Sequence, residues 1–455
     1  MALLAAETTP LVLNVRRKEK DVVMPAQPTP REEKPVSDID DQEGLRFQMP
    51  AIMFYRANPT MEGKDPVKVV KDGLSKALVF YYPFAGRLKE GPNRKLVVDC
   101  TAEGVPFFEA EADATLEDFG DEIHPPFPLD ELLYDIPGTD GMIGTPILIV
   151  QVTRLKCGGF IVALRANHAI TDGTGIMQLM NAVGEMARGH SNPSILPVWD
   201  RERLNARDPP CVTFPHREYE QHHLENGHGH GPTHPDLVQQ SFLFGSTELA
   251  ALRSYAPWDV KPYSTFDILS ASLWRCRIKA LGNDSNDEVG LLFAVNARAK
   301  FNPPLPKGYY GNACAFPVVR ARAGEITSKP IGYILELIRK AKLEVNEEYM
   351  KSIADLMVTK DRPHFTVHLT YVVSDLRHLG FADVDFGWGK PVFGGPASNG
   401  SVPDASFFIS FKNKKGESMT MVPVSLPAPA MEVFVKELQD TLKARPIASQ
   451  VPSLC

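Results

Sequence analysis

Gly159-Phe160-Ile161-Val162-Ala163-Leu164-Arg165-Ala166 runs without a break into Asn167-His168-Ala169-Ile170-Thr171-Asp172-Gly173. The first run is almost wholly apolar, which is typical of a buried strand. Apolar residues then recur at helical spacing, and this predicts a helix from near Asp172, a good N-cap, to near Gly189. A histidine at the exit of a buried strand sits on a rigid scaffold and can still face a cavity. Because an imidazole titrates near neutrality, His168 is well suited to accept a proton from an alcohol.

Composition narrows the class of protein. The chain has 455 residues, of which 43% are hydrophobic and 23% charged, so we expect an ordinary soluble globular protein with two domains. Its net charge of −7 argues against non-specific binding to nucleic acid. The six cysteines are scattered, with neither a CxxC pair nor metal-ligand spacing, and this predicts reduced thiols in the cytoplasm. No apolar run approaches the ~20 residues of a membrane span.

Strand and helix signals alternate on both sides of a different central stretch. Residues 190–236 are rich in proline and lack apolar periodicity after Val212. We therefore predict an α/β protein with an N-terminal domain over 1–190, a crossover over 191–236 and a C-terminal domain over 237–455. In the second half, a long helix is expected from Pro330 to about Lys351.

The crossover holds a concentration of histidines. Half of the twelve histidines in the chain lie there, namely His216, His222, His223, His228, His230 and His234. A metal site is conceivable on composition alone. The interleaved glycines favour a flexible, solvated loop with no ordered ligand geometry instead. We expect no metal site.

Four short constellations have both a chemical and a plain structural interpretation. His168-x-x-x-Asp172 fits a general base near a carboxylate, or a buried histidine beside a helix cap. Asp385-Phe386-Gly387-Trp388-Gly389 fits a bent loop that exposes an indole N–H, or a surface turn with a packed aromatic ring. Tyr309-Tyr310-Gly311-Asn312, preceded by Arg298, suggests a loop near a site with an arginine free to pair with a carboxylate. Ser264-Thr265 fits a phosphate contact at a helix N-terminus, or simple capping. Singly, each motif is weak.

The joint occurrence of these segments, in this order, resembles the plant BAHD acyl-CoA-dependent acyltransferases. The His-x-x-x-Asp-Gly and Asp-Phe-Gly-Trp-Gly motifs of that family are both complete here, and Tyr309-Tyr310-Gly311-Asn312 departs mildly from its Tyr-Phe-Gly-Asn. The likeness covers nearly the whole chain. Segments that match members acting on benzyl alcohol and fruit alcohols are Ser37 to Phe47, Glu90 to Cys100, Ser194 to Trp199 and Asn346 to Val358. The family implies two similar mixed-sheet domains, of the chloramphenicol acetyltransferase type, with a channel between them.

The resemblance also implies roles for individual residues near the histidine. His168 is the general base. Asp172, followed by Gly173, is structural and pairs with Arg298.

Further roles concern residues distant in the sequence. Trp388 is implied as the donor to the oxyanion. Asp385 is grouped with the catalytic residues, although its expected task, with Gly387, is to fix the geometry of its own loop. Ser264 and Thr265 are expected to contact coenzyme A.

The implied reaction is ester formation from acyl-CoA and a small alcohol, with acyl-CoA as co-substrate and no permanently bound cofactor. Benzoyl transfer from benzoyl-CoA to benzyl alcohol is the first expectation. Acetyl-CoA with volatile alcohols, or hydroxycinnamoyl transfer, are alternatives. A thioesterase would need a nucleophile such as that of Gly-x-Ser-x-Gly, which the sequence lacks. A catalytically silent ligand-binding relative is the non-enzymatic option. We expect a monomer with no membrane or nucleic-acid partner.

Overall fold

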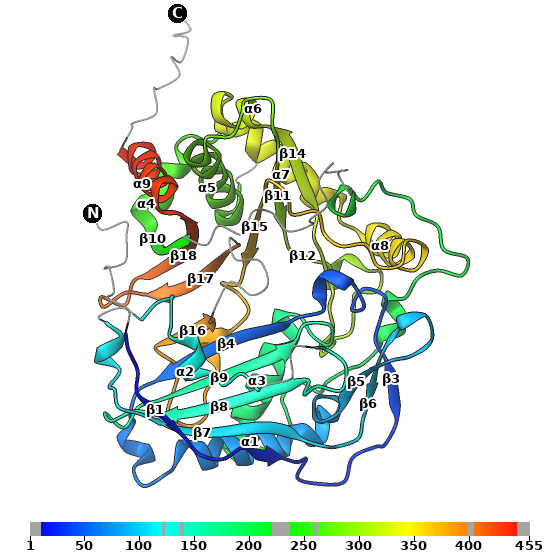
Figure 1. Ribbon diagram of the computed structural model, residues 1–455, viewed down its shortest axis with the longest axis vertical. Helices are drawn as coiled ribbons and strands as arrows, with labels where there is room; N and C mark the ends of the chain where they lie inside the picture. Colours follow the sequence, from blue (N-terminus) through cyan, green and yellow to red (C-terminus); the bar gives the residue numbers. More distant parts are fainter. Residues whose placement is uncertain are drawn as a thin grey trace, which may run out of the picture.

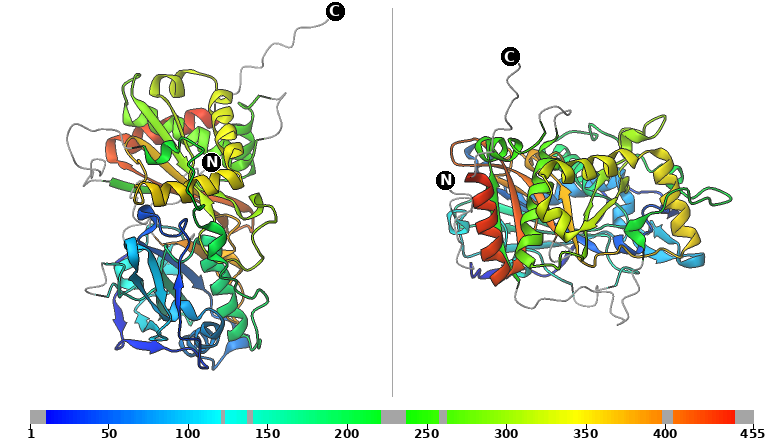
Figure 2. Two further views of the ribbon diagram at one scale, coloured as in Figure 1. Left: turned by 90° about the vertical axis from the view of Figure 1, so that its right-hand side faces the viewer. Right: turned by 90° about the horizontal axis from the view of Figure 1, so that it is seen from above.

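Two mixed β-sheets, each with helices packed beside it, form the two lobes of the molecule (Figures 1 and 2). The computed structural model describes residues 11–120, 123–136, 141–220, 237–257, 263–397 and 405–443. Among these residues, no helix combines the length and the apolarity that crossing a bilayer requires.

The first sheet carries the strand that leads to His168. Its strand order is β1 (Val15–Arg17), β7 (Val105–Ala112), β8 (Leu148–Arg154), β9 (Phe160–Asn167), β4 (Gln48–Tyr55) and β16 (Phe393–Pro396), and β2 (Asp21–Val23) also pairs with β7. Only β7 and β8 run parallel. Helices α1 (Pro66–Phe80) and α3 (Gly173–Ala187) lie together beside this sheet and bury their apolar faces in its core.

The second sheet belongs to the C-terminal half. Its order is β10 (Leu237–Phe244), β18 (Ser418–Pro427), β17 (Ser406–Lys412), β15 (Thr370–Asp375), β11 (Glu288–Phe293) and β14 (Val318–Arg322). The neighbours β11, β15 and β17 are parallel. Its helices are α4 (Ser246–Arg253), α5 (Thr265–Leu281), α6 (Ala323–Ser328), α7 (Ile331–Glu344) and α9 (Ala428–Lys443). Helix α5 is the most deeply buried of them, with Trp274 fully enclosed.

Smaller elements complete the described fold. A three-stranded sheet joins β3 (Glu33–Pro35), β6 (Leu96–Asp99) and β5 (Arg87–Glu90), and β12 (Val295–Asn296) pairs with β13 (Cys314–Ala315). The remaining α-helices are α2 (Leu129–Leu132) and α8 (Glu347–Thr359). Short 3-10 turns are η1 (Glu43–Leu45), η2 (Pro59–Met61), η3 (Tyr82–Ala85), η4 (Pro92–Arg94), η5 (Glu117–Phe119), η6 (Arg201–Leu204), η7 (Arg217–Tyr219), η8 (Arg298–Lys300) and η9 (Phe381–Asp383).

The strand, turn and helix around His168 form where the apolar pattern predicts them. β9 ends at Asn167, and α3 begins after Asp172, whose carboxylate accepts the Gly175 N–H at 3.0 Å. The long helix expected from Pro330 to Lys351 is wrong, because the chain breaks there into α7 and α8. The Asn346 side chain accepts the Tyr349 N–H at 2.9 Å and so caps a new helix. Asparagine favours this cap over a helix interior.

One strand of the C-terminal half crosses to the first sheet. β16 pairs with β4, bringing Phe393 opposite Phe54, and Figure 1 shows β16 beside β4 in the lower lobe. Phe386 and Trp388, just before β16, belong to the first hydrophobic core. The segment that carries Asp385–Gly389 therefore packs with the N-terminal sheet, although the sequence assigned it to the C-terminal domain that begins at residue 237. The domain boundaries at 190 and 236 and the channel between the domains stay predictions.

Candidate active site

His168 lies in the tight turn between β9 and α3. Its main-chain N–H donates to the Phe47 carbonyl at 2.8 Å, and its own carbonyl accepts from Asn312 Nδ2 at 2.7 Å. The imidazole is partly buried, with its ring centre 5.0 Å from that of Phe47. The main chain that carries the imidazole is therefore held on both sides.

The environment of His168 favours the neutral imidazole. Burial lowers the pKa of His168 below its ordinary value. Its own carbonyl and Asp172 act in the opposite direction on this pKa, but burial outweighs them. A histidine with a lowered pKa is unprotonated at neutral pH, which is the state that a general base requires.

Asp172 is engaged by Arg298 rather than by the imidazole. Arg298 Nη1 and Nη2 donate to the two oxygens of Asp172 at 2.8 and 2.9 Å. The same carboxylate accepts the main-chain N–H groups of Gly175 at 3.0 Å and Ala313 at 3.2 Å. Burial raises the pKa of Asp172, but the charge and hydrogen bonds of Arg298 outweigh it and hold this pKa below its usual range. Asp172 thus ties the start of α3 to the loop after β12, as the resemblance implied.

Two glycines at the start of α3 permit this close approach. A Cβ on Gly175 would lie 2.0 Å from the Tyr310 carbonyl oxygen, so only glycine fits there. A Cβ on Gly173 would lie 2.6 Å from Leu379 Cδ1. The need for Gly175 is a tertiary effect that the sequence analysis missed, although Gly173-x-Gly175 is visible in the sequence.

Asp385 turns its carboxylate into its own loop. Its Oδ1 accepts the N–H groups of Gly387 at 2.7 Å and Gly389 at 2.8 Å. Gly387 has φ +113°, a conformation that favours glycine. The loop rests on Gly184, whose Cβ would lie 2.6 Å from the Asp385 carbonyl oxygen. Gly184 is eleven residues along α3, about 16 Å from the end that carries Asp172. Asp385 is therefore a loop-shaping residue, distant from His168.

The structure does not bring Trp388 to His168. The centre of the indole lies 5.0 Å from the Phe160 ring, and the side chain is buried in the first core. Phe160 begins β9 and His168 follows its end, a separation of about 25 Å at the usual strand rise. The expectation that Trp388 donates to the oxyanion is therefore wrong. The residues of the Asp385–Gly389 motif do not indicate which end of β9 their loop packs against.

The placement of Trp388 away from His168 can be tested by mutation. We expect Trp388→Phe to leave kcat within about threefold of wild type, because losing an oxyanion donor costs ~10²–10³-fold and Trp388 is not one. The substitution shrinks a buried ring, so it lowers the melting temperature instead. Steady-state kinetics and thermal denaturation measure both effects. A hundredfold fall in kcat in a fully folded variant would restore the oxyanion role.

Ser264 and Thr265 lie at the N-terminus of α5. The exposed Ser264 caps the helix, accepting the Asp267 N–H at 3.2 Å, while the Asp267 carboxylate accepts the Ser264 hydroxyl at 2.7 Å. The Thr265 hydroxyl accepts from Arg253 Nη2 at 2.8 Å. Capping is thus present, and a contact with coenzyme A stays a prediction.

Three buried polar residues near His168 escaped the sequence analysis as a group. Asp40, Arg201 and Asn312 are each less than 3% exposed and hydrogen-bond to one another or to the His168 turn. Asn312 stands in the Tyr309–Asn312 motif and Asp40 in the segment from Ser37 to Phe47, while Arg201 follows Trp199 by two residues and belongs to no motif. Their proximity had no local signal, because they are separated by more than a hundred residues.

Of the six histidines in the crossover, His216 is the one that lies within the described residues. His216 is buried, with Nε2 2.7 Å from Ser352 Oγ and Nδ1 3.1 Å from Glu218 Oε1. The other five lie outside the described residues. Within the described ranges, no group of three or more His, Cys, Asp or Glu side chains is arranged to hold a metal ion.

Comparisons with known proteins show the family to which this chain is similar. A model of the Transferase family matches residues 13–441. Benzyl alcohol O-benzoyltransferase of Petunia hybrida is 58% identical over 441 residues, 96% of this chain and 95% of that protein. The enzyme of the same name from Nicotiana tabacum is 57% identical, with the same coverage. Alcohol acyltransferase 16 of Actinidia chinensis var. chinensis is 52% identical over 94% of each chain.

Solved structures share the fold. Vinorine synthase gives a TM-score of 0.72 at 23% identity, covering 94% of this chain and 98% of that one. F. graminearum TRI101, complexed with coenzyme A and T-2 mycotoxin, gives 0.73 at 16% identity, covering 88% and 96%. These likenesses confirm the predicted two-domain α/β fold. With the family match over almost its whole length, the chain belongs to the Transferase family, the BAHD acyltransferases that its motifs indicated.

Proposed function

We propose that this protein is an acyl-CoA:alcohol O-acyltransferase that forms benzyl benzoate-type esters, with benzoyl-CoA and benzyl alcohol as its first substrates. The observation that carries the proposal is the position of His168 at the exit of β9, where main-chain hydrogen bonds hold its turn and burial lowers the pKa of its imidazole. The relatives named as benzyl alcohol O-benzoyltransferases, 57–58% identical, supply the substrate class.

In the proposed reaction His168 moves one proton twice. A thioester is already activated, so no covalent enzyme intermediate is needed. The imidazole accepts the proton of the alcohol as its oxygen attacks the thioester carbonyl carbon, and the C–S bond then breaks. The imidazolium returns the proton to the leaving thiolate, so the enzyme ends unchanged. General-base catalysis of this kind contributes about 10²–10⁴-fold.

We propose that Ser264 and Thr265 contact the coenzyme A moiety. Exposed Ser264 stands at the N-terminus of the 17-residue helix α5, where the helix dipole favours anionic groups. Arg253 adds a positive charge beside the Thr265 hydroxyl. The positive end of the helix dipole and the charge of Arg253 suit the phosphate groups of the co-substrate.

The acyl group is the least determined feature of the proposal. Acetyl-CoA with volatile alcohols is the second candidate, and the relative named Alcohol acyltransferase 16, 52% identical, supports an alcohol as the acceptor whichever donor is used. In an apolar pocket one methylene changes selectivity by only ~1–3 kcal/mol, so a modest change in side chains exchanges one donor for another.

A hydrolase is disfavoured, although the fold does contain a serine–histidine–glutamate relay. Ser352, His216 and Glu218 are linked by hydrogen bonds in the order of a catalytic triad. Ser352 is fully buried, and its Oγ already accepts the N–H groups of Thr213 at 2.9 Å and Phe214 at 3.1 Å. We interpret the relay as a structural link that holds residues 213–218 of the crossover against α8.

The experiment that tests the function is an activity matrix of acyl-CoA donors against alcohols, read as free-thiol release and ester formation. Release that depends on the alcohol supports the transferase, and the highest kcat/KM identifies the preferred pair. Release without alcohol would indicate a hydrolase, and no release would indicate a silent relative. Either of the last two results overturns the proposal.

The pH dependence of the rate reports the state of His168. Because burial lowers the pKa of His168, we expect kcat/KM to be flat through neutral pH and to fall only below about pH 6.5, the ordinary histidine value. Activity is lost on the acid side because protonation removes the base. Asp172 does not titrate in this pH range, since Arg298 holds the pKa of its carboxyl below the usual value. An acid limb centred well above pH 6.5 would contradict the assignment.

A further inference from the structure

We propose that Arg201 is a positioning residue for His168, and that its buried guanidinium holds in place the turn that carries the imidazole. The inference rests on the proposed role of His168 as the base. Arg201 begins the 3-10 turn η6 in the crossover and is 1% exposed. Its Nη2 donates to the carbonyl of Ile170 at 2.8 Å, two residues beyond His168.

Asp40 links Arg201 to a second carbonyl of the same turn. The fully buried Asp40 carboxylate lies 3.2 Å from Arg201 Nη1. Its Oδ1 accepts both the main-chain N–H and the Nδ2 of Asn312, each at 2.8 Å. The same Nδ2 donates to the carbonyl of His168 at 2.7 Å. One connected buried network therefore holds the carbonyls of His168 and Ile170.

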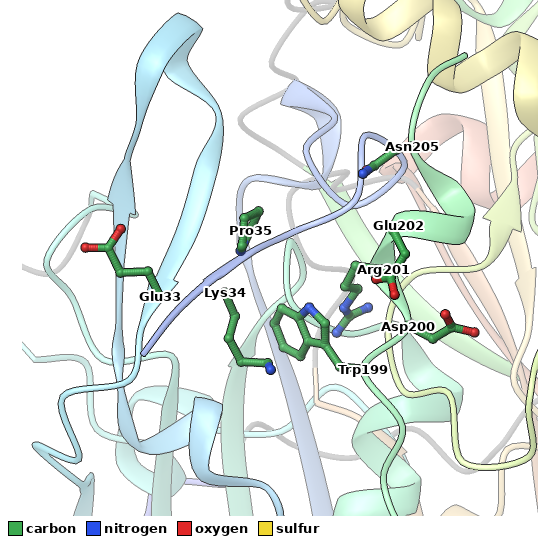
Figure 3. A pocket seen from close by; sticks show the side chains of 8 residues that line it. All are labelled: Glu33, Lys34, Pro35, Trp199, Asp200, Arg201, Glu202 and Asn205. Carbon is green, nitrogen blue, oxygen red and sulfur yellow. The ribbon is translucent and has the colours of Figure 1, made fainter. Parts of the chain in front are cut away.

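The site around Arg201 is built for a planar guanidinium. The guanidinium carbon lies 4.4 Å from the centre of the Trp199 ring, 5.2 Å from that of Tyr309 and 5.0 Å from that of Tyr310. Figure 3 shows Trp199 between Lys34 and Arg201, at the edge of a pocket of about 430 Å³. A Cβ on Gly311 would lie 1.0 Å from Arg201 Nη1. Arginine stacks its planar guanidinium on aromatic faces and holds its donors in a rigid fork, whereas lysine offers a compact ammonium on a flexible stem.

This arrangement explains the Tyr309-Tyr310-Gly311-Asn312 motif. The tyrosines stack on Arg201, Gly311 leaves room for it, and Asn312 transmits its position to His168. The motif therefore acts on the base through the main chain.

The network bears on catalysis because a base works only in the correct place. A displacement of about 1 Å in a reacting group costs up to about 100-fold in rate. The carbonyl of His168 that Asn312 holds is also close enough to its own imidazole to oppose the lowering of the pKa. Asp172 and Asp40 also raise the pKa of the imidazole. Their ion-pair partners Arg298 and Arg201 are the other charged groups of these surroundings. Loosening the turn therefore changes both the burial that lowers the pKa of His168 and the polar contacts that raise it.

The test compares Arg201→Lys with a matched control. We expect Arg201→Lys to lower kcat by about 10- to 100-fold while KM for acyl-CoA stays within about twofold. The acid limb of the pH profile should shift from its wild-type position, because the surroundings of the imidazole change. Asn312→Ser cuts the same path at the His168 carbonyl, so it should reproduce both effects even where Arg201→Lys folds poorly. Arg203→Lys is the matched control, because Arg203 lies in the same 3-10 turn but donates to the carbonyls of Pro303 and Pro304, so it should behave as wild type.

A second readout separates this inference from the proposed function. Histidine side chains are isotope-labelled and the titration of His168 is followed by NMR, with His168→Gln identifying its signal. A shifted titration of His168 in both Arg201→Lys and Asn312→Ser supports positioning, even if the activity matrix finds no transferase. Unchanged titration and kcat in both variants, or a loss of kcat that only matches the unfolded fraction, overturns it.

Discussion

We expect His168→Ala to lower kcat by at least the ~10²–10⁴-fold that a general base contributes. We expect the loss to fall on kcat because the nearby carboxylate of Asp172 is engaged by Arg298 through both oxygens and is not poised to replace the base. The fold survives the change, since the main-chain N–H and carbonyl of residue 168 keep their partners. Steady-state rates with benzoyl-CoA and benzyl alcohol, together with a melting curve, measure both outcomes.

His190→Ala is the matched control for this variant. His190 is exposed just after the end of α3, whereas His168 lies before its start. We expect the control to retain the wild-type rate. A His168→Ala protein that is folded and keeps more than a few per cent of the wild-type kcat would remove His168 as the base.

Asp172→Asn produces the second largest effect, and it acts on stability and turnover together. Asparagine still caps α3, but it leaves the largely buried Arg298 guanidinium without its counter-charge. Removing one partner of a buried ion pair typically costs about 3–5 kcal/mol, and the partly exposed Arg298 places this pair toward the lower end. We also expect kcat to fall by up to about 100-fold, because the helix that follows the His168 turn loses its anchor to the Arg298 loop. Chemical denaturation and steady-state kinetics measure the two losses.

The chain contains a close structural counterpart to serve as the control. Asp65 caps α1, accepting the Val67 N–H at 3.2 Å, and its two oxygens accept from Arg154 at 2.9 and 2.7 Å. This pair is partly exposed and stands at the end of β8 opposite Phe160, at the far end of β9 from His168. We expect Asp65→Asn to cost about 1 kcal/mol or less and to leave kcat unchanged. If Asp172→Asn matched Asp65→Asn in both measurements, the Asp172–Arg298 pair would not anchor the site.

Local sequence patterns predicted the part of the site that lies within one short segment. The strand, the turn with His168 and the capped helix α3 depend on apolar periodicity and on a side chain that bonds to a main-chain group three residues away. Such interactions are complete within about twenty residues, so the sequence contains all the information that they require. The family motifs added the partner Arg298, which lies 126 residues from Asp172.

The sequence by itself determined the two-domain α/β class and the family, and it predicted the base His168 and the pairing of Asp172 with Arg298. Only the tertiary structure decided that β16 joins the N-terminal sheet, that Trp388 meets the far end of β9, and that Arg201, Asp40 and Asn312 converge behind His168. These outcomes depend on which strand edges meet and which buried charges find each other. Such contacts are set by the free energy of the whole packed chain, because a buried charge requires a partner but its own segment does not specify which.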